Sequence, residues 1–109
     1  MAAEMTVNLS AEETASRVRG IVENGSITGE LLDEYIVPYS GGRSIVQVYE
    51  KHYYRAGNRL TLTVVMSEAE GRTHVHLVGG GGGEGLFRFD WGASESFEDS
   101  VVRGVERFA

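Results

Sequence analysis

The sequence predicts an α+β fold of the order β-α-β(4–5)-α, in which a curved antiparallel sheet carries two helices packed on one face. Three observations lead to this prediction. Apolar residues recur at the helical period near both ends of the chain, they alternate at a period of two in the middle, and short turns rich in glycine and asparagine separate the alternating segments. Consecutive strands joined by such short turns pair antiparallel. The 109 residues suffice for a single domain, 1–109, with one modest core.

A short strand over residues 6–9 leads into the first predicted helix, which begins at Ser10 and ends near Gly25. Ser10 and Glu13 have the spacing of a capping box, in which each side chain bonds the other residue's backbone amide. Arg17 follows Glu13 by four residues and is therefore expected to pair with it. The apolar side of this helix, expected to face the sheet, consists of Ala11, Ala15, Val18, Ile21 and Val22.

Alternating segments predict the strands that follow, and the strand at 44–55 alternates irregularly enough to suggest a bulge. The expected strands are 27–38, 44–55, 59–68, 72–79 and a short one over 86–91. The face covered by the helices would carry Leu60, Leu62, Val64, Met66, Val75 and Leu77. The opposite, helix-free face would carry Gln47, Thr61, Thr63, His74 and His76.

The second predicted helix, over residues 94–108, contains a glycine within its apolar stripe. A glycine in a helix interior costs about 1 kcal/mol relative to alanine. We therefore expect Gly104 to permit a close approach of this helix to the sheet or to the first helix.

The predicted element order resembles that of the TATA-binding-protein repeat and, more loosely, that of helix-grip domains that bind small lipidic ligands. No residue motif accompanies this likeness, so neither DNA binding nor ligand binding is carried over. Three segments, Asn24-Gly25-Ser26-Ile27, Gly57-Asn58-Arg59 after a tyrosine-rich strand, and Leu86-Phe87-Arg88-Phe89 after a glycine run, resemble a family of small bacterial single-domain proteins of unknown function. That resemblance implies a self-standing cytoplasmic domain and no particular chemistry.

Composition excludes several classes of function. The chain has no cysteine, which excludes disulfides and thiolate chemistry, and its net charge of −6 argues against nucleic-acid binding. No apolar stretch approaches the roughly 20 residues that span a bilayer, and the N-terminus lacks the basic-then-apolar pattern of a secretory signal. The expected location is the cytoplasm, and the sequence predicts no cofactor.

A glycine run, 79–85, places six glycines in seven positions and is the first candidate functional element. Its spacing matches the dinucleotide fingerprint, but that fingerprint needs a helix to follow, whereas strand-like residues follow here. A flexible or bulged connection between strands is the favoured interpretation. The alternative is a set of backbone amides that bind an anion or a partner. The candidate binding residues in the run are Gly80, Gly81, Gly82 and Gly83.

The second candidate is a polar and aromatic sheet surface. His74 and His76 lie on one face of a strand at a spacing that metal sites use, but a third ligand would have to be His52 or a carboxylate of a neighbouring strand. The same residues equally suit an ordinary solvated face. Tyrosines, with Tyr49 and Tyr53 as candidates, would make a helix-free face suited to partner or ligand contact, or would simply form cross-strand pairs.

These patterns favour a non-catalytic binding or interaction domain. It is expected to self-associate, as a homodimer, through the helix-free sheet face or its edge, because two helices cover only one face. No catalytic residue and no nucleic-acid or membrane partner is predicted, and any small-molecule ligand is unidentified. The alternative is a small metal- or anion-dependent enzyme that uses the His74/His76 face or the glycine-rich loop.

Overall fold

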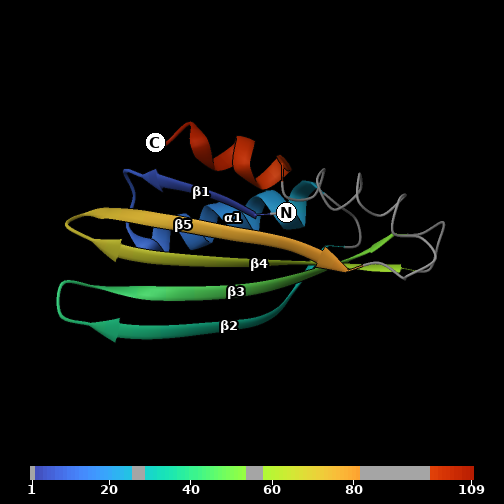
Figure 1. Cartoon of the computed structure of the whole chain (residues 1–109), viewed down its shortest axis with the longest axis horizontal. Coiled ribbons are helices and arrows are strands. Elements are labelled where there is room, and N and C mark those ends of the chain that lie inside the picture. Colours follow the sequence, from blue (N-terminus) through green and yellow to red (C-terminus); the bar gives the residue numbers. More distant parts are fainter. Residues whose placement is uncertain (1, 26–28, 54–57, 82–98) are drawn as a thin grey trace.

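The computed structural model describes residues 2–25, 29–53, 58–81 and 99–109, and it has a five-stranded open antiparallel sheet with two helices (Figure 1). This arrangement confirms the predicted α+β fold class. The predicted strand at 86–91 lies outside the described residues. The strands are β1 (Ala2–Val7), β2 (Glu30–Tyr39), β3 (Gly42–Tyr53), β4 (Asn58–Ala69) and β5 (Arg72–Gly81). The helices are α1 (Ala11–Gly25) and a C-terminal helix over residues 99–106.

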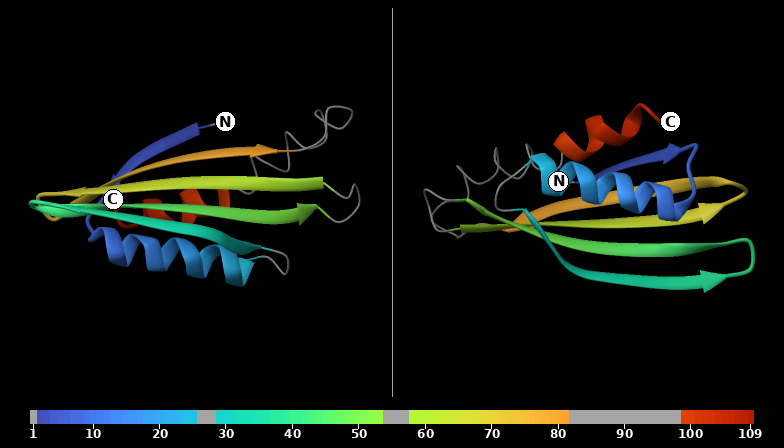
Figure 2. Two further views of the ribbon diagram at one scale, coloured as in Figure 1. Left: turned by 90° about the horizontal axis from the view of Figure 1, so that it is seen from below. Right: turned by 180° about the vertical axis from the view of Figure 1, so that it is seen from behind.

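The strand order in the sheet is β1-β5-β4-β3-β2. Strands β2 to β5 follow one another as an antiparallel meander, and β1 then pairs with β5, with Met5 opposite Val75. The first strand of the chain therefore lies beside the last described one. Both helices lie on the same side of this sheet, and the C-terminal helix runs beside α1 on the side of β1 (Figure 2).

The capping box at the start of α1 is confirmed. The Glu13 amide donates to Ser10 Oγ at 3.1 Å, and the Ser10 amide donates to Glu13 Oε1 at 3.4 Å. A further hydrogen bond, from the Ala11 amide to Glu68 Oε1 at 3.1 Å, ties the start of the helix to β4. The expected ion pair between Glu13 and Arg17 does not form. The Arg17 guanidinium lies over the Phe108 ring instead.

The core lies between the sheet and the helices, and α1 packs mainly on β3 and β4. All six strand residues predicted to face the helices are fully buried, which confirms that face. Gly104 approaches α1 as expected, since a Cβ atom at Gly104 would lie 2.3 Å from Ile21 Cδ1. The absence of a side chain at Gly104 is therefore what lets the two helices meet there.

Two details of the sheet differ from the expectations. Gln47 was expected on the helix-free face, but it lies beneath α1 with 1% exposure, where its amide nitrogen donates to the Ala15 carbonyl oxygen at 3.3 Å. The bulge expected in β3 lies instead in its neighbour β2, where the register shifts between Leu31 and Asp33. Strand β3 itself alternates regularly from Ile45 to Tyr49.

Candidate functional site

The helix-free face of the sheet is the candidate site, because no described helix covers it (Figure 2). One continuous row of residues crosses it from edge to edge through the cross-strand register. This row changes from apolar on β2, β3 and β4 to polar on β5 and β1. In strand order it consists of Tyr35, Val46, Val65, His76 and Glu4.

The apolar part of this face is concentrated on β2, β3 and β4. We call it the tyrosine–valine patch, and it consists of Tyr35, Val37, Tyr39, Val46, Val48 and Val65. The residues on β2 are the most exposed, with Tyr35 at 62%, Val37 at 40% and Tyr39 at 44%. The Tyr39 hydroxyl donates to the Glu68 carbonyl oxygen at 2.8 Å, which holds that ring in place. Large apolar side chains exposed together on one face are typical of interaction surfaces.

The edge strand β2 carries several features that oppose pairing with another strand. Its register shift at Leu31 and Asp33 leaves Leu32 as an extra residue, and Pro38 has no amide hydrogen to donate. Charged side chains also line the strand, among them Glu30 and Glu34. Bulges, prolines and charges are the means by which natural sheets protect their edges. The open edge is thus less suited to contact than the face beside it.

The polar part of the face is a cluster around Glu4. The Glu4 carboxylate lies 2.8 Å from His76 Nδ1 and 3.8 Å from His74 Nε2, while the Thr6 hydroxyl lies 3.3 Å from His74 Nδ1. These four residues, the histidine–glutamate cluster, are half-exposed and come together because β1 pairs with β5. Within the part of the chain that the structure describes, no group of three His, Asp or Glu side chains is arranged to hold a metal ion.

Tyr49 does not belong to this surface, which corrects its inclusion among the partner-binding candidates. It lies on the helix-covered face with 0% exposure, and its hydroxyl donates to Gln47 Oε1 at 2.5 Å. Gln47 in turn donates to Glu34 Oε2 at 2.8 Å. Burial raises the pKa of the Tyr49 hydroxyl well above its ordinary value of 10.0, because the phenolate would lose its hydration. The side chain of Tyr53 lies outside the described residues.

The glycine run begins as strand. Strand β5 continues through Gly80 and Gly81, and Gly80 lies opposite Thr61 of β4. A Cβ atom at Gly80 would lie 3.5 Å from Thr61 Oγ1, an ordinary contact, so this position has space for a methyl group. Gly82 and Gly83 lie outside the described residues, and a role for them in binding stays a prediction.

Sequence reasoning found both histidines and missed their partner Glu4. The residue was not considered because the first strand was predicted only over residues 6–9, whereas β1 begins at Ala2. The valines of the patch were likewise seen as strand residues and not as surface. The sequence did contain a signal for this pairing. Glu4 and Thr6 would lie on one side of a strand, and an antiparallel pairing places them opposite His76 and His74.

Comparisons with known proteins place the chain in a family without assigning it an activity. A search of the curated proteins returned no match. Among the described residues, no helix is long and apolar enough to cross a membrane. A family model, DUF6054, matches residues 1–109. The chain therefore belongs to DUF6054, a family of unknown function.

Proposed function

We propose that this chain is a non-catalytic interaction domain that self-associates through the helix-free face of its sheet. The observation that carries the proposal is the tyrosine–valine patch, whose most exposed members lie on β2. A one-sided antiparallel sheet is normally polar on its open face, because that face is in contact with water. Tyr35 and Val37 depart from that pattern, and burial against a partner removes their apolar surface from water.

The partner that fits best is a second copy of the chain. Two copies related by a twofold axis present the same surface to each other, so an apolar patch meets an apolar patch and needs no separate complement. The net charge of −6 opposes association at long range, so the contact should strengthen as salt screens that repulsion. A different protein with a basic binding surface would show the opposite dependence on salt.

The area of the face is sufficient for a stable dimer. Five strands spaced about 4.8 Å apart, with an average length of roughly 33 Å, cover about 800 Å². A standard protein–protein interface buries about 800 Å² on each partner. The edge of β2 alone offers a much smaller contact and carries the protective features described above, so the proposal favours the face over the edge.

Neighbouring residues of β2 give a matched test. Val37 and Ile36 have similar exposure, 40% and 45%, but Val37 lies on the helix-free face and Ile36 on the helix-covered side. We expect the parent protein to have a dimeric mass by light scattering at high micromolar concentration. Val37→Asp should shift the mass to that of a monomer, and Ile36→Asp should leave the dimer intact.

Each of the other outcomes is decisive. A monomeric parent at high micromolar concentration and raised salt would overturn the proposal. Equal loss of the dimer in Val37→Asp and Ile36→Asp would assign the contact to the β2 edge and also overturn it. Far-UV circular dichroism of both variants checks that neither aspartate has unfolded the sheet.

A further inference from the structure

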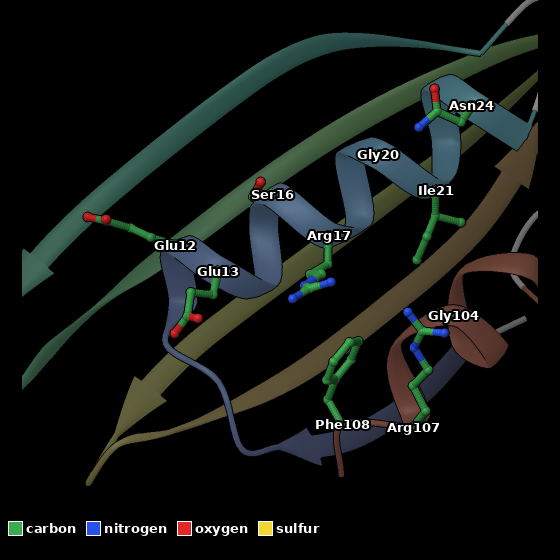
Figure 3. Close-up of a pocket in the computed structure, with 10 residues that line it drawn as sticks. All are labelled: Glu12, Glu13, Ser16, Arg17, Gly20, Ile21, Asn24, Gly104, Arg107 and Phe108. Carbon is green, nitrogen blue, oxygen red and sulfur yellow. The ribbon is translucent and has the colours of Figure 1, made fainter.

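A second surface, unconnected with the helix-free face, lies between the two helices. The helices separate to leave an open groove of about 840 Å³ (Figure 3). This volume is within the range of small-molecule sites. Its lining includes Ser16, Arg17, Ile21, Asn24, Arg107 and Phe108. Two carboxylates line it as well: Glu12 pairs with Arg43, and Glu13 accepts a hydrogen bond from the Ser10 hydroxyl.

The apolar wall of the groove is held in a fixed position. Ile21 contacts Gly104 at the point where the helices meet, and Phe108 follows the C-terminal helix. The Phe108 carbonyl oxygen accepts a hydrogen bond from the Asn8 amide at 2.7 Å, which anchors it to the end of β1. The backbone at Phe108 is therefore tied to the residue that follows β1.

Two arginines share the Phe108 ring. The guanidinium carbon of Arg17 lies 4.7 Å from the ring centroid, and that of Arg107 lies 5.0 Å from it. Figure 3 shows Arg17 pointing from α1 toward Phe108 and Arg107 pointing from the end of the chain toward α1. Both are permanent cations, and cations this near the same ring repel each other across less than about 10 Å.

Neither of these arginines makes an ion pair with any described residue. Arg19, Arg43 and Arg59 each have a glutamate partner within 4.0 Å, whereas Arg17 and Arg107, like Arg72 and Arg103, have none in the described part of the chain. The carboxylate best placed for Arg17, that of Glu13, is bonded to Ser10. Arg17 and Arg107 are exposed and, among the described residues, contact the Phe108 ring and no carboxylate, so both guanidinium groups can bond an anion that enters the groove.

We propose that this groove binds a small organic anion, a phosphate monoester or a carboxylate, with a planar apolar part. The anionic group would lie between Arg17 and Arg107, where guanidinium forks can bond its oxygens in pairs and where it would cancel their repulsion. The apolar part would lie on Ile21 and Phe108. The Ser16 hydroxyl and the Asn24 amide, both exposed and both lining the groove, are further hydrogen-bond donors.

The test uses the full chain and phenyl phosphate as the probe, with inorganic phosphate as the comparison. Isothermal titration calorimetry should show saturable binding of phenyl phosphate, with weaker binding of inorganic phosphate because it lacks the apolar part. Arg17→Gln and Arg107→Gln should each weaken phenyl phosphate binding at least tenfold. Glutamine keeps most of the side-chain stem, and circular dichroism checks that each variant is folded.

Arg72→Gln is the matched control. Arg72 is exposed at the turn between β4 and β5, does not line the groove and carries the same charge. Its replacement should leave phenyl phosphate binding unchanged. Equal weakening by Arg72→Gln and Arg107→Gln would mean non-specific attraction and would overturn the proposal.

The same chemistry could be presented by a free metabolite or by a lipid headgroup. Cosedimentation with phosphatidylglycerol vesicles separates the two sources. Vesicle binding that needs Arg17 and Arg107 assigns a headgroup, while phenyl phosphate binding without vesicle binding assigns a free anion. Absence of both kinds of binding would overturn the proposal.

Discussion

Tyr49 and Tyr35 belong to neighbouring strands of the same sheet and have opposite surroundings. Tyr49 points to the helices, is fully buried and ends in a chain of hydrogen bonds through Gln47 to Glu34. Tyr35 points the other way and keeps 62% of its surface in contact with solvent. The two residue types are identical, so the difference comes entirely from which face the strand register assigns to each.

The comparison shows that the two faces of this sheet differ in how far their side chains are buried. The helix-covered face uses its apolar and polar residues for stability, since even its polar groups are bonded to one another. The helix-free face has apolar residues that contribute little to the folded monomer. Substitutions should therefore separate the faces, with large effects on stability at one and effects on association at the other.

The largest separation is expected from replacing each tyrosine with alanine. Tyr49→Ala removes a fully buried ring and leaves Gln47 without its donor, which should cost about 3–5 kcal/mol. Tyr35→Ala should cost less than about 1 kcal/mol, the range of cross-strand pairs. Urea unfolding at low protein concentration, where a dimer is dissociated, measures both. Equal losses would show that the faces do not differ in this way.

Much of the helix-covered face could be predicted because hydrophobic alternation reports burial directly. Leu60, Leu62 and Val64 were placed correctly for that reason. Gln47 was not, because a polar residue in an alternating strand is read as exposed. Ile45 and Tyr49 lie two positions before and after Gln47, so all three side chains point to the same face of the strand. That alternation would have placed Gln47 on the helix-covered face.

The candidate surfaces were predicted less well than the fold, since they depend on pairings between distant segments. The histidine–glutamate cluster needs β1 beside β5, and no local pattern states that adjacency. The groove needs Arg17 and Phe108, 91 positions apart in the chain, to meet. Helical period placed Gly104 in an apolar stripe correctly, but it did not show that a groove with two cations opens beside it.

Substitutions of two helix glycines, Gly104 and Gly20, should give the next largest difference in stability. Gly104→Leu must displace Ile21, because even a Cβ atom there would lie 2.3 Å from Ile21 Cδ1, and we expect a loss of about 1–3 kcal/mol. Gly20→Ala is the matched control, since its Cβ atom would meet only Asn24 Nδ2 at 3.9 Å. That change should stabilise α1 by up to about 1 kcal/mol. Thermal unfolding compares the pair, and an unchanged melting temperature for Gly104→Leu would contradict the packing.

Tyr49→Phe tests the hydroxyl alone and should cost about 1 kcal/mol near neutral pH. Because burial holds the pKa of the folded Tyr49 hydroxyl above its unfolded value of 10.0, its contribution is complete below pH 10.0 and declines as the pH rises further. The stability difference between parent and Tyr49→Phe should therefore narrow above that pH. Tyr35→Phe removes a hydroxyl from the exposed face and is the matched control at neutral pH, where its stability should be close to that of the parent.

The smallest expected effect concerns the polar half of the helix-free face. Glu4 is 59% exposed, so its interactions with His76 and His74 are solvated, and Glu4→Gln should lower stability by less than about 1 kcal/mol. That small loss should shrink further at about 1 M salt, where the screening length falls to about 3 Å. Urea unfolding of parent and variant at low and high salt measures the difference. A large, salt-independent loss would mean that Glu4 is held as tightly as Gln47, and the polar half of this face would then have a structural task like that of the helix-covered face.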